Sequence, residues 1–198
     1  HVFTTPEQKE AVESFRRFLS DKVDPIFRKE YRDNGLMPKE KMRELNRQMT
    51  GFGMISGAVS EANGGLGIDF LTLTMLFEEI TACATDLSTV VLINTFSAKM
   101  LDMLAPAHIR ERYLPGLLSG ELFGCMAFSE PDVGSNVMEI KARARRDGDD
   151  YILSGEKCWI SNGSFSDFMI VAARTSDDPR KGLSHFVLDR KEHPYRVQ

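Results

Sequence analysis

The sequence predicts an α+β protein. An N-terminal all-helical domain over residues 1–120 is followed, over residues 121–198, by an antiparallel β-domain. Apolar residues recur at spacings of three and four in the first part, whereas short apolar or alternating runs separated by turn residues follow Gly120. Helices and strands that occupy separate parts of a chain are typical of an α+β fold or of two domains.

Five helical segments are predicted in the first domain. Thr5-Pro6-Glu7-Gln8 combines a hydroxyl N-cap, a proline at the first helical position and a glutamine three residues after the cap, so it predicts a helix start. Pro25 is expected to kink or end this helix, and Pro115 to break the last helix one turn before its apolar pattern ends. The glycine-rich segment Glu61–Gly67 predicts a loop. The other helix starts are expected at Pro38, Asp69, Asp86 and Pro106.

Five strands are predicted after Gly120. Ala142–Arg145 alternates apolar and charged residues, and the Asp147-Gly148 pair that follows is a hairpin turn signal. Phe168–Ala173 is apolar throughout, which predicts a buried strand. The remaining strands are expected at 122–128, 151–153 and 184–188.

Composition excludes several classes of protein. Of the residues, 42% are hydrophobic and 27% charged, as in globular domains, and the formal net charge of −4 leaves no basic surface typical of nucleic-acid binding. The longest stretch without a charged residue, Gln48–Ser60, is shorter than the roughly 18 apolar residues of a membrane span. Cys83, Cys125 and Cys158 show no disulfide or zinc spacing, which favours a soluble protein of a reducing compartment. The chain opens at His1 without a methionine or a signal sequence, which leaves a processed, a trimmed and a tagged product as open alternatives.

Isolated reactive residues indicate little chemistry. None of the four histidines has a partner at metal-ligand spacing, and neither a nucleophile elbow nor a phosphate loop is present. His185 is expected to be structural. Glu78 and Glu79 are adjacent, so on a helix they point roughly 100° apart. The sequence therefore predicts no metal site and no catalytic residue.

Two polar segments carry the functional signal: Phe128–Asn136 and Gly155–Gly163. Each contains hydroxyl side chains expected at a strand end, and the second contains Trp159, the single tryptophan. Hydroxyls beside a glycine and an indole suit a flat, electron-accepting ring with a phosphate tail. On chemistry alone, an ordinary turn and a core tryptophan remain the alternative.

The same segments resemble the paired signature of the acyl-CoA dehydrogenase family. Ser-Glu-Pro-x-x-Gly-Ser-Asn begins at Ser129, and Gly-x-Lys-x-Trp-Ile-Ser-Asn-Gly begins at Gly155. Glu61–Gly67 is similar to the family's Glu-x-x-Gly-Gly-x-Gly loop, and Arg112–Glu121 to its run into the first β-strand. The four motifs occur in the family's order, and the resemblance spans the chain from the first helix to Leu188.

The resemblance implies three domains with FAD between them: a helical domain, a barrel-like β-domain that we expect to be incomplete in this sequence, and a C-terminal helical bundle that is absent from it. That bundle supplies the family's glutamate base, so no catalytic base is expected here, and Glu130 is expected to be structural. Ser129 would lie near the pyrimidine edge of the flavin, Trp159 against its rings and Ser161 near N5, while Ser135 would touch both the FAD phosphates and the acyl-CoA. The full set of residues implied to bind FAD is Met126, Ala127, Phe128, Ser129, Gly134, Ser135, Trp159, Ile160 and Ser161.

The implied activity is FAD-dependent dehydrogenation of an acyl-CoA to a 2,3-enoyl-CoA, with electrons passed to an electron-transfer flavoprotein. A homo-oligomer in the bacterial cytoplasm or the mitochondrial matrix is expected of the full-length protein. Acyl-CoA oxidases and flavin monooxygenases of the same fold are alternatives, as is a non-catalytic piece or subunit completed by a partner chain. Asn136 stands where the family usually has aspartate, which removes one charge from the first segment. The acyl-chain length is not indicated, and neither is the choice between a homodimer and a homotetramer.

Overall fold

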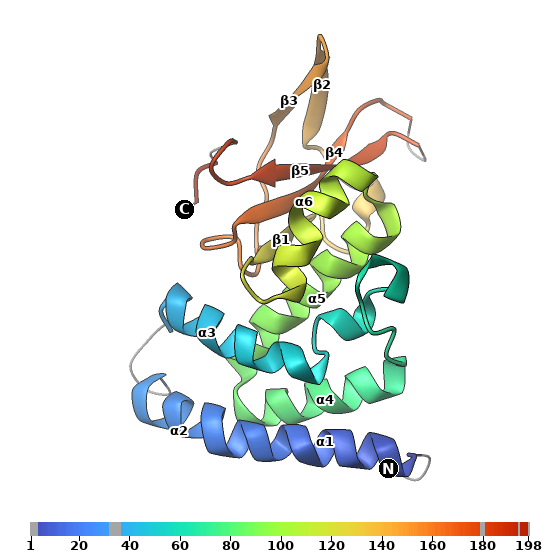
Figure 1. The fold of residues 1–198 in the computed structure, drawn as a ribbon. Coiled ribbons are helices and arrows are strands. Elements are labelled where there is room, and N and C mark those ends of the chain that lie inside the picture. Colours follow the sequence, from blue (N-terminus) through green and yellow to red (C-terminus); the bar gives the residue numbers. More distant parts are fainter. Residues whose placement is uncertain (1–3, 32–36, 179–180, 194, 198) are drawn as a thin grey trace. The chain divides into compact units, whose positions relative to one another are not determined.

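The computed structural model describes residues 4–31, 37–178, 181–193 and 195–197, and the chain divides into two compact units, residues 1–122 and 123–198 (Figure 1). The first unit is helical and the second is built on a β-sheet. The predicted fold class, a helical domain followed by a β-domain, is therefore confirmed.

The first unit contains six α-helices within the described residues. Short π-helical turns at Leu19–Val23 and Phe27–Tyr31 flank α2, and 3₁₀ turns at Thr50–Phe52, Ser56–Ala58 and Glu61–Asn63 separate α3 from α4. The helices are α1 (Pro6–Phe18), α2 (Asp24–Ile26), α3 (Lys39–Met49), α4 (Phe70–Cys83), α5 (Thr85–Leu104) and α6 (Ala107–Leu118).

Helix α1 begins with the capping box that its sequence predicts. The Thr5 hydroxyl accepts from the backbone N–H of Gln8, and the Gln8 side chain accepts from the backbone N–H of Thr5. Pro25 does not end the helical path, which the π-helical turns continue on either side of α2. The first π turn closes with the N–H of Asp24 donating to the carbonyl of Leu19, five residues back. Pro25, which has no N–H to donate, therefore comes immediately after a completed turn.

The helical core is centred on α5. Its buried residues lie on most of its faces, as its apolar composition predicts. By length and composition α5 could cross a membrane, but half of the relevant window is buried inside the structure, which is typical of a core helix. In α6 the expected break at Pro115 is wrong, because the helix continues to Leu118. The Ser119 N–H donates to the Pro115 carbonyl and closes the last turn, so the proline costs one donor near the helix end.

Asp102 on α5 fixes the start of the glycine-rich loop. Its buried carboxylate accepts from the Ser60 hydroxyl at 2.6 Å, from the Ser60 N–H at 3.2 Å and from the Asn63 amide at 2.6 Å. Burial by itself would raise the pKa of Asp102, but these hydrogen bonds outweigh it and lower the pKa to about 2. The loop expected at Glu61–Gly67 is present, with its first three residues in a 3₁₀ turn.

The second unit is a five-stranded mixed sheet. Strand β4 is central: β1 pairs with it in parallel, β5 pairs with it antiparallel along its whole length, and β2 and β3 form the predicted hairpin. The prediction of a purely antiparallel sheet is corrected on this point. The long connection from Ala127 to Phe168 allows β1 and β4 to run in the same direction. The strands are β1 (Gly124–Ala127), β2 (Arg143–Asp147), β3 (Asp150–Ser154), β4 (Phe168–Arg174) and β5 (Leu183–Asp189).

We predict that Asp102→Asn lowers the free energy of unfolding by about 2 kcal/mol at neutral pH. The pKa of Asp102 is depressed in the folded state, so its contribution is present above its ordinary pKa near 4 and is lost as the pH falls toward about 2. Urea unfolding of both proteins between pH 7 and pH 2.5 measures the difference, which should shrink with acid. Asp21→Asn, on an exposed residue, is the control. A wild-type advantage that stayed constant down to pH 2.5 would contradict this assignment.

Candidate functional site

The sheet topology brings the two polar segments to one place in the second unit. Because β5 pairs along all of β4, strands β1 and β2 must share the other edge of β4. Ala127 ends β1 opposite Val171, and Arg143 begins β2 opposite Arg174. The first segment therefore belongs to a long excursion that leaves and rejoins one edge of the sheet.

The second segment lies beside the first. The backbone N–H of Cys158 donates to the Ser129 carbonyl at 3.0 Å. The Lys157 ammonium donates to the Phe128 carbonyl at 3.1 Å and to Oε1 of Glu130 at 2.8 Å. The two motifs, which are separated by the β2–β3 hairpin in the chain, thus form one continuous structure.

Glu130 is structural, in agreement with the expectation from sequence. Its carboxylate is buried and also accepts from the backbone N–H groups of Lys141 and Ala142, at 2.7 and 2.9 Å. Burial would raise the pKa of Glu130, but the hydrogen bonds from Lys157, Lys141 and Ala142 outweigh it and hold the pKa below its ordinary value. A carboxylate that stays ionised and is occupied by three donors is poorly suited to act as a general base.

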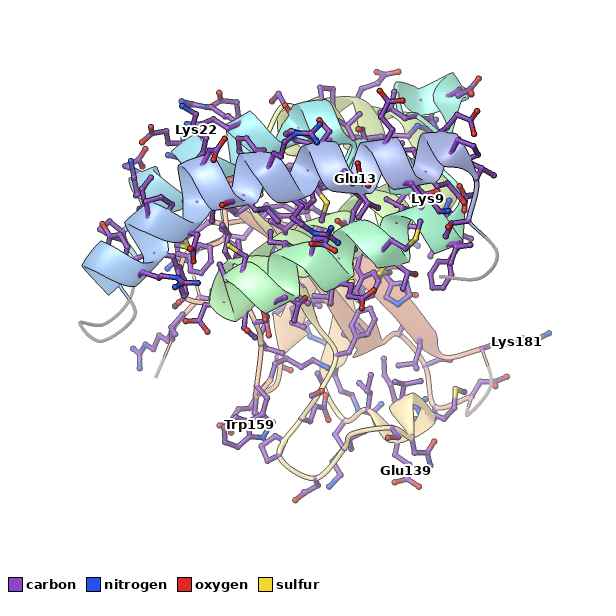
Figure 2. All side chains as sticks on the ribbon, turned by 90° about the horizontal axis from the view of Figure 1, so that it is seen from below. Lys9, Glu13, Lys22, Glu139, Trp159 and Lys181 are labelled. Carbon is purple, nitrogen blue, oxygen red and sulfur yellow. The ribbon has the colours of Figure 1, made fainter. Side chains whose placement is uncertain are left out.

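Trp159 is the most unusual residue of the second segment. Its exposed fraction is 92%, and Figure 2 shows its side chain at the periphery of the unit, so the alternative of a core tryptophan is wrong. Its position at a strand end is also corrected, because β3 ends at Ser154 and Trp159 lies in the irregular stretch that follows. Trp159 and Asn162 are the non-glycine residues with positive φ in the described part of the chain, at 57° and 65°. Such conformations cost roughly 1–3 kcal/mol and concentrate at functional sites.

Asn162 anchors the turn that carries Ser161. Its side-chain amide donates to the Gly124 carbonyl at the start of β1, at 3.2 Å. Its own carbonyl accepts from the N–H groups of Phe165 and Ser166. The residue before this anchor, Ser161, is exposed. The turn is thereby held to the sheet while the hydroxyl remains accessible.

The hydroxyl groups of the predicted set are available to a ligand. Within the described ranges, the side-chain hydroxyls of Ser129, Ser135 and Ser161 make no hydrogen bond. Ser135 and Ser161 are exposed, and Ser129 is half-buried. Gly134 has an ordinary φ, and a Cβ built on it would meet no atom of the described chain within 4 Å. The folded chain itself therefore gives no reason for a glycine at this position.

The apolar members of the predicted set are placed differently. Ala127 is fully buried, and Phe128 packs against the core of the unit with its ring stacked on His185 at a centroid distance of 5.3 Å. Met126 and Ile160 are half-buried. Phe128 thus presents its backbone carbonyl, rather than its ring, to the second segment. His185 serves as a packing partner, as expected, and burial lowers its pKa.

Sequence reasoning missed the residues that join the segments. Lys157 lies two positions before Trp159 in the second motif, but nothing in the spacing shows that its ammonium reaches Glu130, 27 residues earlier. The backbone donors of Lys141 and Ala142 carry no side-chain signal at all. Asn136 donates its amide to Glu139 at 2.8 Å, a hydrogen bond that an aspartate could not donate. The described residues include no cluster of side chains that could hold a metal ion.

Comparison with known families decides the classification. The family description "Acyl-CoA dehydrogenase, N-terminal domain" matches residues 5–121, and "Acyl-CoA dehydrogenase, middle domain" matches residues 125–198. The chain belongs to the acyl-CoA dehydrogenase family. This confirms the family resemblance inferred from the four motifs.

Individual relatives agree with the family. Mitochondrial isovaleryl-CoA dehydrogenase of Pongo abelii is 31% identical over 189 residues, which is 93% of this chain and 44% of that protein. A structure of glutaryl-CoA dehydrogenase from Mycobacterium smegmatis in complex with FADH2 matches with a TM-score of 0.81 and 25% identity, over 94% of this chain and 46% of that one. The FAD complex of PigA matches with a TM-score of 0.81 and 25% identity, over 94% and 49%. The chain therefore spans less than half the length of these relatives.

We predict that two glycine substitutions in the paired segments differ in their effect on the free energy of unfolding. Gly155 has φ +148°, and an added Cβ would lie 2.6 Å from the Ala142 Cβ, so Gly155→Ala should lower the free energy of unfolding by about 2 kcal/mol or more. Gly134→Ala should change it by less than about 0.5 kcal/mol. Chemical denaturation followed by circular dichroism measures both. Equal stabilities of the two variants would show that Gly155 does not contact Ala142 in solution.

Proposed function

We propose that this chain forms the flavin-side part of an FAD-dependent acyl-CoA dehydrogenase, which converts an acyl-CoA to its 2,3-enoyl-CoA. The observation that carries the proposal is Trp159: an indole held in a strained backbone conformation, almost fully exposed, within two residues of an unused hydroxyl. An exposed aromatic ring beside free hydrogen-bond donors is the arrangement expected where a flat, polar-edged ring binds. The family membership names that ring as a flavin.

The residues present fit FAD. Trp159 offers an aromatic surface to the isoalloxazine, and Ser161 and Ser129 offer hydroxyl donors for its polar edge. Gly134, which would tolerate a Cβ within the chain, permits a phosphate to approach the backbone next to the Ser135 hydroxyl. These placements follow the family motif residue by residue. Ser135 is also the residue we propose to contact the acyl-CoA.

FAD, when bound, supplies the hydride acceptor for the β-carbon of the substrate. The part of this chain is to bind and orient. Fixed hydroxyl donors such as Ser129 and Ser161 favour the negative charge that develops in the site and need no rearrangement as the reaction proceeds. Glu130 is occupied by three donors, so we assign the base that removes the α-proton to the part of the full-length protein outside this sequence.

The remaining assignments follow from the same family. We propose an electron-transfer flavoprotein as the acceptor, a homo-oligomeric full-length enzyme, and a location in the bacterial cytoplasm or the mitochondrial matrix. Acyl-CoA oxidase and flavin monooxygenase activities are separated from this proposal by one measurement. Peroxide produced from acyl-CoA and oxygen without an added electron carrier would favour the oxidase.

We predict that Trp159→Ala in the full-length protein weakens FAD binding by roughly tenfold or more, the loss expected when an aromatic stacking partner is removed. Trp159→Phe should retain most of the affinity because it keeps an aromatic surface. Titration of the apoprotein with FAD, followed by flavin absorbance and fluorescence, measures both.

Phe70→Ala provides the matched control. Phe70 is also a largely exposed aromatic residue, with an exposed fraction of 86%, but it lies at the start of α4. Its removal should leave FAD affinity unchanged. An unaltered affinity and flavin spectrum in Trp159→Ala would overturn the proposed placement of the flavin.

A further inference from the structure

Lys157 and Glu130 form an ion pair that is buried in the second unit. The exposed fractions of their side chains are 11% and 5%. Other ion pairs among the described residues of this unit, such as Lys141–Asp132, lie at the surface. Removing two charges from water is costly unless each is fully hydrogen-bonded. The desolvation of this pair must therefore be compensated by the hydrogen bonds that its two side chains make inside the unit.

The pair lies where the two motif segments meet. Lys157 comes from the second segment, while both of its acceptors, the Glu130 carboxylate and the Phe128 carbonyl, belong to the first. Among the backbone hydrogen bonds of the described residues, the bond from Cys158 to Ser129 joins the same two segments. The two segments are thus joined by one backbone hydrogen bond and by two hydrogen bonds from the Lys157 ammonium. Lys157 lies two residues before Trp159.

Glu130 in turn ties the junction to the sheet. Its two oxygens accept from the backbone N–H groups of Lys141 and Ala142, directly before β2. Ala142 itself accepts from the Arg174 N–H at the end of β4. A chain of short contacts therefore runs from the central strand through Glu130 to Lys157 and on to the Trp159 backbone.

We propose that Lys157 is a positioning residue: by bridging Glu130 and the Phe128 carbonyl, it sets the register of Trp159 and Ser161 against Ser129. Lys157 does not touch the ligand. It fixes where an indole and two hydroxyls stand relative to one another. The proposal rests on the proposed function in that the ligand positioned in this way is FAD.

The ion pair can be broken at either residue, and the two choices leave different buried charges behind. Loss of Glu130 would leave the buried Lys157 ammonium with the Phe128 carbonyl as its remaining acceptor among the described residues. Loss of the ammonium instead leaves Glu130 with its two backbone donors. Lys157→Met keeps the alkyl stem, so it should remain folded, whereas Glu130 variants are expected to be poorly stable.

The test compares Lys157→Met with Lys141→Met in the full-length protein. Lys141 forms an exposed ion pair with Asp132, a residue of the first segment. Its substitution therefore removes a cation close to the junction without removing a contact between the two segments. Lys157→Met should weaken FAD binding roughly tenfold to a hundredfold and shift the flavin absorbance bands, whereas Lys141→Met should do neither. Lys157→Arg, which restores the cation, should recover most of the affinity. FAD binding and spectrum of Lys157→Met that match those of Lys141→Met would overturn the proposal.

Amide hydrogen exchange without FAD separates this proposal from the proposed function. The Cys158 N–H is protected by the Ser129 carbonyl, so its exchange reports the junction directly. In Lys157→Met it should exchange about tenfold faster or more, while β4 amides keep their wild-type rates. If the wild-type protein failed to bind FAD, the proposed function would be wrong, and accelerated Cys158 exchange would still support the positioning role. Unchanged Cys158 exchange would refute it.

Discussion

The Glu130 carboxylate is the contact on which the organisation of the second unit depends. It receives hydrogen bonds from the backbone ahead of β2 and from the Lys157 ammonium of the second segment, and it lies next to Ser129 in the first. Three stretches of chain that are distant in sequence are therefore joined at one buried charge. A neutral side chain of the same shape could not accept from all of these donors at once. The same ionised group that excludes Glu130 from proton transfer makes it an effective anchor.

Much of the fold follows from local signals. The capping box at Thr5, the N-cap at Asp69 and the hairpin turn at Asp147-Gly148 each depend on residues within a few positions of one another, and each appears as predicted. The expected break at Pro115 is wrong because the proline removes only its own N–H donor, while the Ser119 N–H still closes the last turn and the apolar side chains of Leu114 and Leu117 remain buried. The parallel pairing of β1 with β4 does not follow from the sequence pattern, because strand direction depends on the length of the connection and on tertiary packing rather than on alternation within a strand.

The sequence indicates which segments form the candidate site but not how their side chains are arranged. Serine, glycine and tryptophan in two segments indicate a ring-binding surface, and the structure leaves those hydroxyls unused. The exposure and positive φ of Trp159, by contrast, depend on neighbours that no short pattern specifies. Phe128 illustrates the limit: the motif includes it, yet its partly buried ring packs against the core of the unit and stacks on His185 of β5. The motif therefore includes residues whose side chains support the fold as well as the exposed residues that we propose to meet a ligand, and the sequence pattern does not distinguish the two.

The shared edge of β4 has a consequence for how such a protein can diversify. The sheet register is fixed on both sides of the excursion, by Ala127 opposite Val171 and by Arg143 opposite Arg174, so only two residues of β4 separate its two ends. Outside Glu130 and the Lys141–Ala142 donors that hold it, insertions, deletions or exchanges within that excursion are not expected to change this register. Evolution can thus alter what the excursion recognises while the scaffold remains constant, in the way that hypervariable loops change on a conserved framework.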